Sequence, residues 1–423
     1  MGRSPAAARH SGETYDKEPT HVIRQWVPAW SLVVAACAAS GTREVAVRPG
    51  IDVLLTDSIH LVEGRRVGLL TNQTGVDRRG VSDVDRLLQA GVNLTALFSP
   101  EHGFRGALEE ENIGHGVDSA TGLPVYSLYG DVRAPTPAML QNLDVVLVDL
   151  QDIGARPYTY ISTLLLTLEA AAAERKPVVV LDRPNPIAGV TVQGDILDTA
   201  FATFVGMLPV PLRHGMTMGE LARFGAARRG LSASLLVVPV AGWDRGQWFD
   251  ETGLPWVRPS PNMPDVESAT HYPGIVVFEG TNLSVGRGTP IAFQVVGAPW
   301  LDPARVRARV GEVPGVLVSD TAITPIDPTD HKYPAQRLPA LKVRAADRGI
   351  YDPTLLAARL LVAIREVHRD RLSFNPPIFD RLAGSDAWRL AILRGESGEQ
   401  TWQSWQPAVA EFTRLREAYL LYR

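Results

Sequence analysis

The chain has 423 residues, of which 45% are hydrophobic and 21% are charged, and its formal net charge is −4. This composition is ordinary for a globular protein, so it excludes wholesale disorder and a membrane protein with several spans. The nearly balanced charge gives no indication of a nucleic-acid partner, and a single cysteine excludes a disulfide framework and a cysteine-based zinc site within the chain.

The first predicted feature is an export signal. An apolar run at residues 26–36 follows Arg24 and ends at Cys37, and it is too short and too interrupted by Pro28 for a spanning helix. Residues 34–37 (VAAC) resemble the lipobox of bacterial lipoproteins, in which the cysteine carries the lipid. We therefore expect an exported, periplasm-facing envelope lipoprotein with Cys37 as its lipidation site; a small buried cysteine or a plain signal ending are the alternatives.

Strands and helices then alternate as far as residue 250. Apolar runs of strand length lie at 66–72, 94–99, 125–129, 144–152, 177–182 and 235–240, and segments with helical spacing lie at 83–90, 162–174 and 217–229. Continuous apolar runs that alternate with helices indicate parallel strands buried on both faces. The pattern predicts an α/β domain with a doubly wound, mainly parallel sheet.

The sequence changes character after residue 250. Proline and glycine become dense at 253–264 and 286–290, and helices are predicted at 303–310, 353–367 and 406–421 among shorter strands. We predict a second, smaller α+β domain that completes a cleft with the first. The predicted division is a signal and lipobox segment at 1–37, a linker at 38–49, the larger domain at 50–250 and the smaller C-terminal domain at 251–423.

Polar side chains follow nearly every predicted strand of the first domain. In an open parallel sheet, ligands bind beyond the carboxyl ends of the strands, so these side chains predict a site built by the fold. The candidates are Asn72, Glu101, His102, Arg105, Gln151, Asp152, Tyr158, Tyr160, Asp182, Arg183, Asn185, Arg213 and His214.

Several familiar chemistries lack their signatures. No G-x-G-x-x-G motif follows a strand, and neither G-K-[ST] nor G-x-S-x-G occurs, so we expect no nucleotide cofactor and no serine elbow. Carboxylate, histidine, asparagine, arginine and tyrosine side chains remain, and this set suits carbohydrate. Glycoside cleavage needs a carboxylic acid beside the leaving oxygen, and Glu101 is the best candidate. Its alternative role is to cap a helix or to pair with Arg105.

Eight short motifs in one order carry a family resemblance. They are residues 68–75 (GLLTNQTG), 99–106 (SPEHGFRG), 121–130 (TGLPVYSLYG), 149–160 (DLQDIGARPYTY), 181–186 (LDRPNP), 213–217 (RHGMT), 259–264 (PSPNMP) and 279–289 (EGTN and GRGT). The chain resembles the DUF1343 family, which is associated with NamZ-type exo-β-N-acetylmuramidases of peptidoglycan recycling. The resemblance implies a Rossmann-like domain with a smaller C-terminal domain, release of terminal N-acetylmuramic acid (MurNAc) from peptidoglycan fragments, and Glu101 as the catalytic glutamate.

Such a substrate sets further requirements. The lactyl carboxylate of MurNAc needs a fixed cation, for which Arg105, Arg183, Arg213 and Arg287 are candidates. The acetamido group and the hydroxyls could be bound by Asn72, Asn185, Asn262 and Asn282. Glu279 is the first choice for the second catalytic carboxylate. Asp152 and Asp182 are alternatives, and Glu169 is either a functional or a structural acid.

Two other functions stay open at this point. A metal-dependent hydrolase could use His102, Asp152, Asp182 and His214, although no close ligand motif is present. A lipoprotein that captures muropeptides without cleaving them is the other alternative. We expect a peptidoglycan-derived sugar as partner, membrane contact only through the N-terminal lipid, and neither nucleic acid nor metal.

Overall fold

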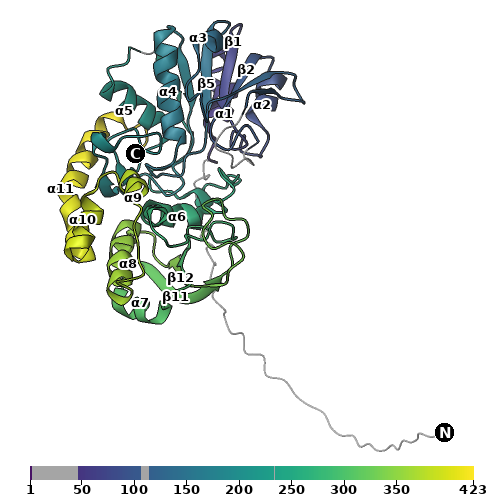
Figure 1. The fold of residues 1–423 in the computed structure, drawn as a ribbon. Helices are drawn as coiled ribbons and strands as arrows, with labels where there is room; N and C mark the ends of the chain where they lie inside the picture. Colours follow the sequence, from purple (N-terminus) through teal and green to yellow (C-terminus); the bar gives the residue numbers. More distant parts are fainter. Residues whose placement is uncertain (2–45, 106–113, 233) are drawn as a thin grey trace, which may run out of the picture. The chain divides into compact units, whose positions relative to one another are not determined.

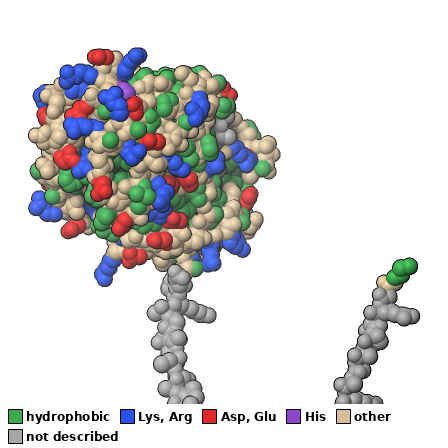
Figure 2. Space-filling view, turned by 90° about the horizontal axis from the view of Figure 1, so that it is seen from below, with side chains coloured by type: hydrophobic (Ala, Val, Ile, Leu, Met, Phe, Trp, Pro, Cys, Tyr) green, Lys and Arg blue, Asp and Glu red, His purple; other side chains and the backbone are tan. Residues whose placement is uncertain are grey.

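The computed structural model describes residue 1 and residues 46–105, 114–232 and 234–423, so the predicted signal and the lipidation site Cys37 lie outside the described part. Val45–Arg423 form one compact unit. Within the described ranges, no helix has the length and apolar character needed to cross a membrane. Basic and acidic side chains are interspersed over the face that Figure 2 shows, in keeping with the small net charge.

A seven-stranded sheet forms the centre of the first domain (Figure 1). Its order is β3-β4-β2-β1-β5-β6-β9, in which β3 alone pairs antiparallel. The strands are β1 (Arg66–Thr71), β2 (Asn93–Ser99), β3 (Gly116–Val117), β4 (Pro124–Ser127), β5 (Val145–Asp149), β6 (Val178–Leu181) and β9 (Leu235–Val238). The chain steps outward from β1 to β4 and returns to β5 on the other side of β1. This doubly wound order confirms the predicted fold class and places the topological switch point between β1 and β5.

Helices cover both faces of this sheet because alternate strand residues point to opposite sides. One face of β1 and β5 packs Leu69 and Leu147 against α1 (Gly50–Asp57) and α2 (Asp83–Gln89). The other face packs Leu70 and Val148 against α4 (Tyr160–Ala173) and α5 (Met218–Arg228). The short α3 (Pro137–Leu140) precedes β5, and a two-stranded hairpin of β7 (Gln193–Ile196) and β8 (Pro211–Arg213), which the sequence did not predict, precedes α5.

The C-terminal domain has a three-stranded antiparallel sheet and six α-helices. The sheet order is β10-β12-β11, formed by Val295–Gly297, Leu338–Ala345 and Val316–Ile323. The helices are α6 (Val266–Ile275), α7 (Pro303–Val310), α8 (Pro353–Val367), α9 (Pro376–Ala383), α10 (Ala387–Arg394) and α11 (Gly398–Arg416). The described residues also form five short 3₁₀ turns: η1 (Ile59–Leu61), η2 (Thr199–Phe201), η3 (Phe249–Glu251), η4 (Val276–Gly280) and η5 (Glu417–Tyr419).

The C-terminal helices confirm two predicted ranges and correct a third. Helices α7 and α8 occupy the predicted residues. The predicted helix at 406–421 begins earlier, at Gly398, because Ser397 and Gln400 form a capping box and the helix continues through Pro407. It also ends earlier, at Arg416, where the 3₁₀ turn at Glu417–Tyr419 follows. The hydrophobic core on the α4 side of the large sheet continues into α6, α8 and α11, so the two domains share one core.

Candidate active site

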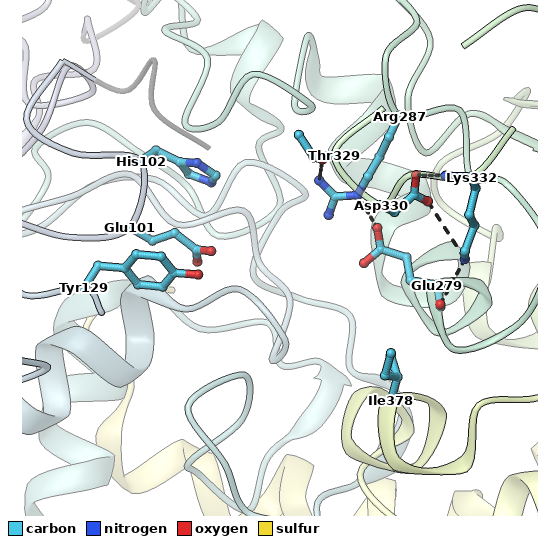
Figure 3. A pocket seen from close by; sticks show the side chains of 9 residues that line it. All are labelled: Glu101, His102, Tyr129, Glu279, Arg287, Thr329, Asp330, Lys332 and Ile378. Atoms are coloured by element: carbon cyan, nitrogen blue, oxygen red, sulfur yellow. Dashed lines mark hydrogen bonds and ion pairs between the residues drawn. The ribbon is translucent and has the colours of Figure 1, made fainter. Parts of the chain in front are cut away.

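A cavity of about 360 Å³ opens beside Glu101 and draws residues from both domains. Its lining consists of Glu101, His102 and Tyr129 from the large domain and Glu279, Arg287, Thr329, Asp330, Lys332 and Ile378 from the C-terminal domain. The carboxylate of Glu101 and the Glu279–Arg287 pair face each other across the cavity (Figure 3). The structure thus brings together both predicted catalytic carboxylates, His102 and Arg287.

Glu101 owes its position to the turn that follows β2. Pro100 ends the strand, and His102 and Gly103 take left-handed conformations with φ of 70° and 74°. This conformation costs a non-glycine residue about 1 kcal/mol or more, so the turn at His102 is held by its surroundings. Thr159, the residue before α4, donates a hydrogen bond from its hydroxyl to the carboxylate of Glu101. The side chain is therefore fixed at the edge of the cavity.

On the opposite wall, Glu279 forms an ion pair with Arg287. Their side chains are only 15% and 22% exposed, and the guanidinium lies 5.3 Å from the ring centroid of Phe293. Burial lowers the pKa of Arg287, but the charge and hydrogen bond of Glu279 outweigh it and raise the pKa above its ordinary value. Two of the five N–H donors of Arg287 go to Glu279 and Thr329, so the guanidinium retains donors for a ligand.

Lys332 fixes the backbone of this wall. Its ammonium group donates hydrogen bonds to the carbonyl oxygens of Glu279 and Leu283, both at 2.9 Å, and lies 3.9 Å from Asp330. Burial lowers the pKa of Lys332 and raises that of Asp330. Because the ammonium is engaged with main-chain oxygens, its role is to hold the loop that carries it against η4.

A second cavity of about 130 Å³, which we call the rear chamber, adjoins the first. It shares Glu101, His102, Glu279 and Arg287 with the first cavity, and its other lining residues are Pro157, Tyr158, Thr159, Val205, Ser260, Tyr272, Phe293 and Leu382. The rings of Tyr158, Tyr272 and Phe293 form a continuous wall, with centroid separations of 6.0 and 4.7 Å. Burial raises the pKa of both tyrosines, so their hydroxyls stay protonated.

Other predicted residues do not belong to the described lining of the two cavities and bond to neighbouring groups instead. Asn72 donates from its side-chain nitrogen to the hydroxyl of Tyr160 at 2.7 Å and accepts from the hydroxyl of Thr74 at 2.6 Å. Gln151 donates to the carbonyl oxygens of Asp152 and Pro184. These side chains lie at the carboxyl ends of β1 and β5, where the sequence placed them, but they tie neighbouring loops together.

The proposed metal-ligand set is not brought together. Asp152 lies 3.2 Å from His214. Asp182 instead accepts hydrogen bonds from the hydroxyls of Thr217 and Tyr422, both at 2.6 Å, and burial raises its pKa to about 6. The part of the chain that the structure describes contains no group of three or more histidine, cysteine or acidic side chains suited to a metal ion. The metal-dependent alternative therefore lacks its ligand cluster among these residues.

Of the four candidate arginines, three have partners away from the two cavities. Arg183 pairs with Asp149, and Arg213 donates to Gln193 at 3.0 Å and lies 5.2 Å from the ring centroid of Trp248. Arg105 pairs with Asp118 at 2.7 Å while its side chain stays 69% exposed, so the sequence alternative of a Glu101–Arg105 pair is not what the structure shows. Arg287 is thus the candidate that lines the cavities.

The candidate asparagines also hold loops. Asn185 donates to the carbonyl oxygen of Met216 at 2.9 Å, and Asn282 accepts from the backbone N–H of Ser373 at 3.0 Å. Asn262 accepts from the backbone N–H of Gly288 at 3.4 Å, next to Arg287. None of the three belongs to the lining of the cavities beside Glu101. Glu169 pairs with Arg229, the residue that caps the C-terminal end of α5, and it does not belong to the described lining of either cavity.

Sequence reasoning missed several lining residues. Tyr129 and Thr159 lie inside the motifs at 121–130 and 149–160, so the motifs contained a signal for them. Thr329, Asp330 and Lys332 lie outside every motif. Lys332 could have been noticed for its rarity, because the chain has only four lysines.

Models of the exo-β-N-acetylmuramidase NamZ match the chain in two parts, the N-terminal model at residues 67–267 and the C-terminal model at 270–422. The peptidoglycan β-N-acetylmuramidase NamZ of Bacillus subtilis (strain 168) is 38% identical over 401 residues, which cover 93% of this chain and 96% of that protein. Two crystal structures of DUF1343 family proteins from Bacteroides fragilis are similar to the whole fold. They have TM-scores of 0.84 and 0.71 and identities of 35% and 31%, and each covers 90% of this chain and nearly all of its own.

Proposed function

Because the chain belongs to the NamZ family of exo-β-N-acetylmuramidases, which are glycoside hydrolases, we propose that it releases terminal MurNAc from peptidoglycan fragments with Glu101 as the general acid. The observation that supports this most is the position of Glu101. Its carboxyl group is fixed by Thr159 at the edge of a cavity, and an ion-paired carboxylate lies on the opposite wall. A positioned carboxylic acid can protonate the glycosidic oxygen as the bond to the sugar breaks.

Arg287 is the residue that we propose for the lactyl carboxylate of MurNAc. It lines both cavities, it has N–H donors left beyond Glu279 and Thr329, and its planar guanidinium suits bidentate recognition of a carboxylate. This group separates MurNAc from N-acetylglucosamine (GlcNAc), which lacks the lactyl ether. Arg287 would therefore set the preference for MurNAc.

The test of the function is release of para-nitrophenol from para-nitrophenyl β-MurNAc by the purified protein, with the GlcNAc analogue as the comparison substrate. We expect release from the MurNAc substrate and loss of at least about 100-fold in kcat for Glu101→Gln. No release by the unaltered protein would refute the activity and leave a muropeptide-binding protein. Full activity of Glu101→Gln would refute only the role of Glu101. Activity that persists in EDTA would exclude a metal-dependent hydrolase.

We further propose that the protein is exported and anchored to the cell envelope through a lipid on Cys37. The support is the sequence of residues 24–37, which combines a cation, an apolar run and a lipobox-like ending. The full-length protein should incorporate labelled palmitate in bacteria and partition into detergent, whereas Cys37→Ala should do neither. Labelling of Cys37→Ala equal to that of the natural chain would refute the anchor.

A further inference from the structure

The rear chamber adjoins the first cavity and shares part of its lining. It meets the first cavity at Glu101, His102, Glu279 and Arg287. With a volume of about 130 Å³ against about 360 Å³, it is the smaller of the two spaces. We therefore take the first cavity as the place of the sugar ring and the rear chamber as the place of a substituent.

We propose that the rear chamber binds the acetamido group on C2 of MurNAc, and that the carbonyl oxygen of this group displaces the leaving sugar. The inference rests on the proposed function, because it takes the reacting atom C1 to lie beside Glu101. The carbon next to C1 that bears a substituent is C2. The acetamido group is therefore the substituent that reaches a chamber adjoining Glu101.

The walls of the chamber suit a neutral, partly apolar group. Tyr158, Tyr272, Phe293 and Leu382 are buried and present rings and methyl groups. The hydroxyl of Tyr158 is buried and has no hydrogen-bond partner among the described residues. The carbonyl oxygen of an acetamido group that enters the chamber can accept a hydrogen bond from the Tyr158 hydroxyl, while its methyl group contacts the aromatic wall.

The lactyl carboxylate fits the chamber less well. Transfer of a carboxylate to an apolar wall costs far more than transfer of an amide unless a cation compensates it. Among the described residues that line the chamber, the one cation is Arg287, which also faces the first cavity and carries the Glu279 ion pair. The lactyl group can reach Arg287 from the first cavity and leave the chamber to the acetamido group.

The chemical step then needs no carboxylate nucleophile. A lone pair of the carbonyl oxygen forms a bond to C1 as the bond between C1 and the leaving oxygen breaks, and the leaving oxygen takes the proton of Glu101. The product is a cyclic oxazolinium ion. Water next adds to C1 while Glu101, now a carboxylate, takes its proton, and the electron pair of the ring C–O bond returns to the carbonyl oxygen. The sugar is released with its β-configuration retained.

This step gives Glu279 a defined task. Its carboxylate lines both cavities and is oriented by Arg287, and its backbone is held by Lys332. It can accept a hydrogen bond from the acetamido N–H, which becomes more acidic as positive charge develops on the former amide. Glu279 is then a carboxylate that stabilises the positive charge of the cyclic ion, and its ion pair with Arg287 holds it in place for this role.

The experiment compares para-nitrophenyl β-MurNAc with its N-trifluoroacetyl analogue, and the product of the first substrate is examined by proton NMR before it equilibrates. Fluorine withdraws electrons from the carbonyl oxygen, so we expect kcat/KM to fall by about 100-fold or more and the first product to be the β-anomer. A change of less than about threefold, or an α-anomer, would overturn the proposal. Cleavage of para-nitrophenyl β-MurNAc itself tests the proposed function. The analogue and the anomeric configuration of the product test only the role of the acetamido group.

A stable analogue of the cyclic ion gives a second test. The thiazoline derived from MurNAc should inhibit competitively with a constant at least about 100-fold below KM, because it resembles the species that the site stabilises. Val205→Phe, which narrows the chamber, should weaken this inhibition at least about tenfold, whereas Val190→Phe, at a site 57% exposed and outside the chamber, should not change it. Inhibition no stronger than substrate binding, or equal inhibition of both variants, would overturn the proposal.

Discussion

Replacement of Arg287 by methionine is predicted to remove most of the preference for MurNAc over GlcNAc. Methionine keeps much of the length and the apolar contact of the arginine stem with Phe293 but has no N–H donors. The substitution also leaves the carboxylate of Glu279 without its ion-pair partner, which would repel the lactyl carboxylate. The variant Arg287→Met/Glu279→Gln removes that repulsion. Comparison of the two variants therefore separates the loss of the guanidinium donors from the effect of an unpaired Glu279 carboxylate.

The expected size follows from the environment of Arg287. Its side chain is 22% exposed, so a hydrogen-bonded contact with a carboxylate is only partly screened by solvent. Charge-assisted hydrogen bonds contribute about 1.5–3 kcal/mol, which corresponds to roughly 10- to 150-fold in kcat/KM. The ratio of kcat/KM for the MurNAc and GlcNAc substrates should fall by this factor. Any loss of activity that comes from Glu279 affects both substrates and therefore cancels in the ratio.

The assay is a cycle of two substrates and two proteins, in which the lactyl group and the guanidinium are removed separately and together. Arg105→Met is the matched control, because Arg105 is also an arginine near Glu101 but pairs with Asp118 outside the cavities. Its ratio should stay within about twofold of that of the unaltered protein. An unchanged ratio in both Arg287 variants would refute the assignment of Arg287 to the lactyl carboxylate. A lowered ratio in Arg105→Met would indicate that Arg105 binds this group instead.

Three further outcomes are expected. Burial raises the pKa of Asp182 to about 6, so the folded protein binds a proton at this carboxyl group more tightly than the unfolded chain does. Proton binding therefore adds to the free energy of unfolding at low pH, and this added stability is lost as the pH rises from about 4 to 6. The shift of about two units corresponds to about 3 kcal/mol, and Asp182→Asn should remove that much of the pH dependence of the unfolding free energy in urea; an equal slope would contradict this. Thr159→Val should lower kcat about tenfold with little change in KM, because Glu101 loses its fixed hydrogen bond, and an unchanged kcat would deny Thr159 a positioning role. Gly274→Ala places a Cβ 1.9 Å from the carbonyl oxygen of Pro353 and should lower the unfolding free energy by about 2–3 kcal/mol, which an unchanged urea midpoint would refute.

The strands of the large sheet could be predicted because their residues are buried on both faces. In β5 all five residues are buried, and a strand buried on both faces reads in the sequence as a continuous apolar run. The order of the strands could not be read in the same way, since nothing local in β4 or β5 says on which side of β1 each one pairs. Burial is a property of a short segment, whereas pairing depends on the packing of the complete chain.

The candidate residues show the same limit at the level of side chains. Polar residues after a strand can face a cavity or can bond to the next loop, and the spacing is the same in both cases. Glu101 faces the cavity, whereas Arg183 turns to Asp149 and Asn185 to the backbone of Met216. The motifs located the right edge of the sheet and left the direction of each side chain undecided.

The loop that supplies the far wall had no pattern to recognise. Non-glycine residues with positive φ recur along it, at Asp327, His331, Tyr333 and Ala335, and this conformation has no periodic signature in a sequence. The loop is held by tertiary contacts such as those of Lys332 with the backbone of η4. Residues placed by such contacts become visible only in the folded chain.

The topology also explains why the site lies to one side of the switch point. Nucleotide-binding sheets of this order leave room for a pyrophosphate between the first and fourth parallel strands. Here the acidic Asp83 and Asp149 lie buried at that position, where Asp83 accepts a hydrogen bond from Thr71 and Asp149 pairs with Arg183. Burial raises the pKa of both acids.

With that position filled, the open carboxyl ends are those of β2 and β4, which carry Glu101 and Tyr129 to the cavity. An acid on a strand end alone would face solvent. The C-terminal domain supplies the opposite wall through Glu279 and Arg287. The hydrophobic core that both domains share on the α4 side holds the two walls in fixed positions. The doubly wound sheet therefore provides one half of the proposed glycosidase site, and the second domain encloses the acid at the end of the strand.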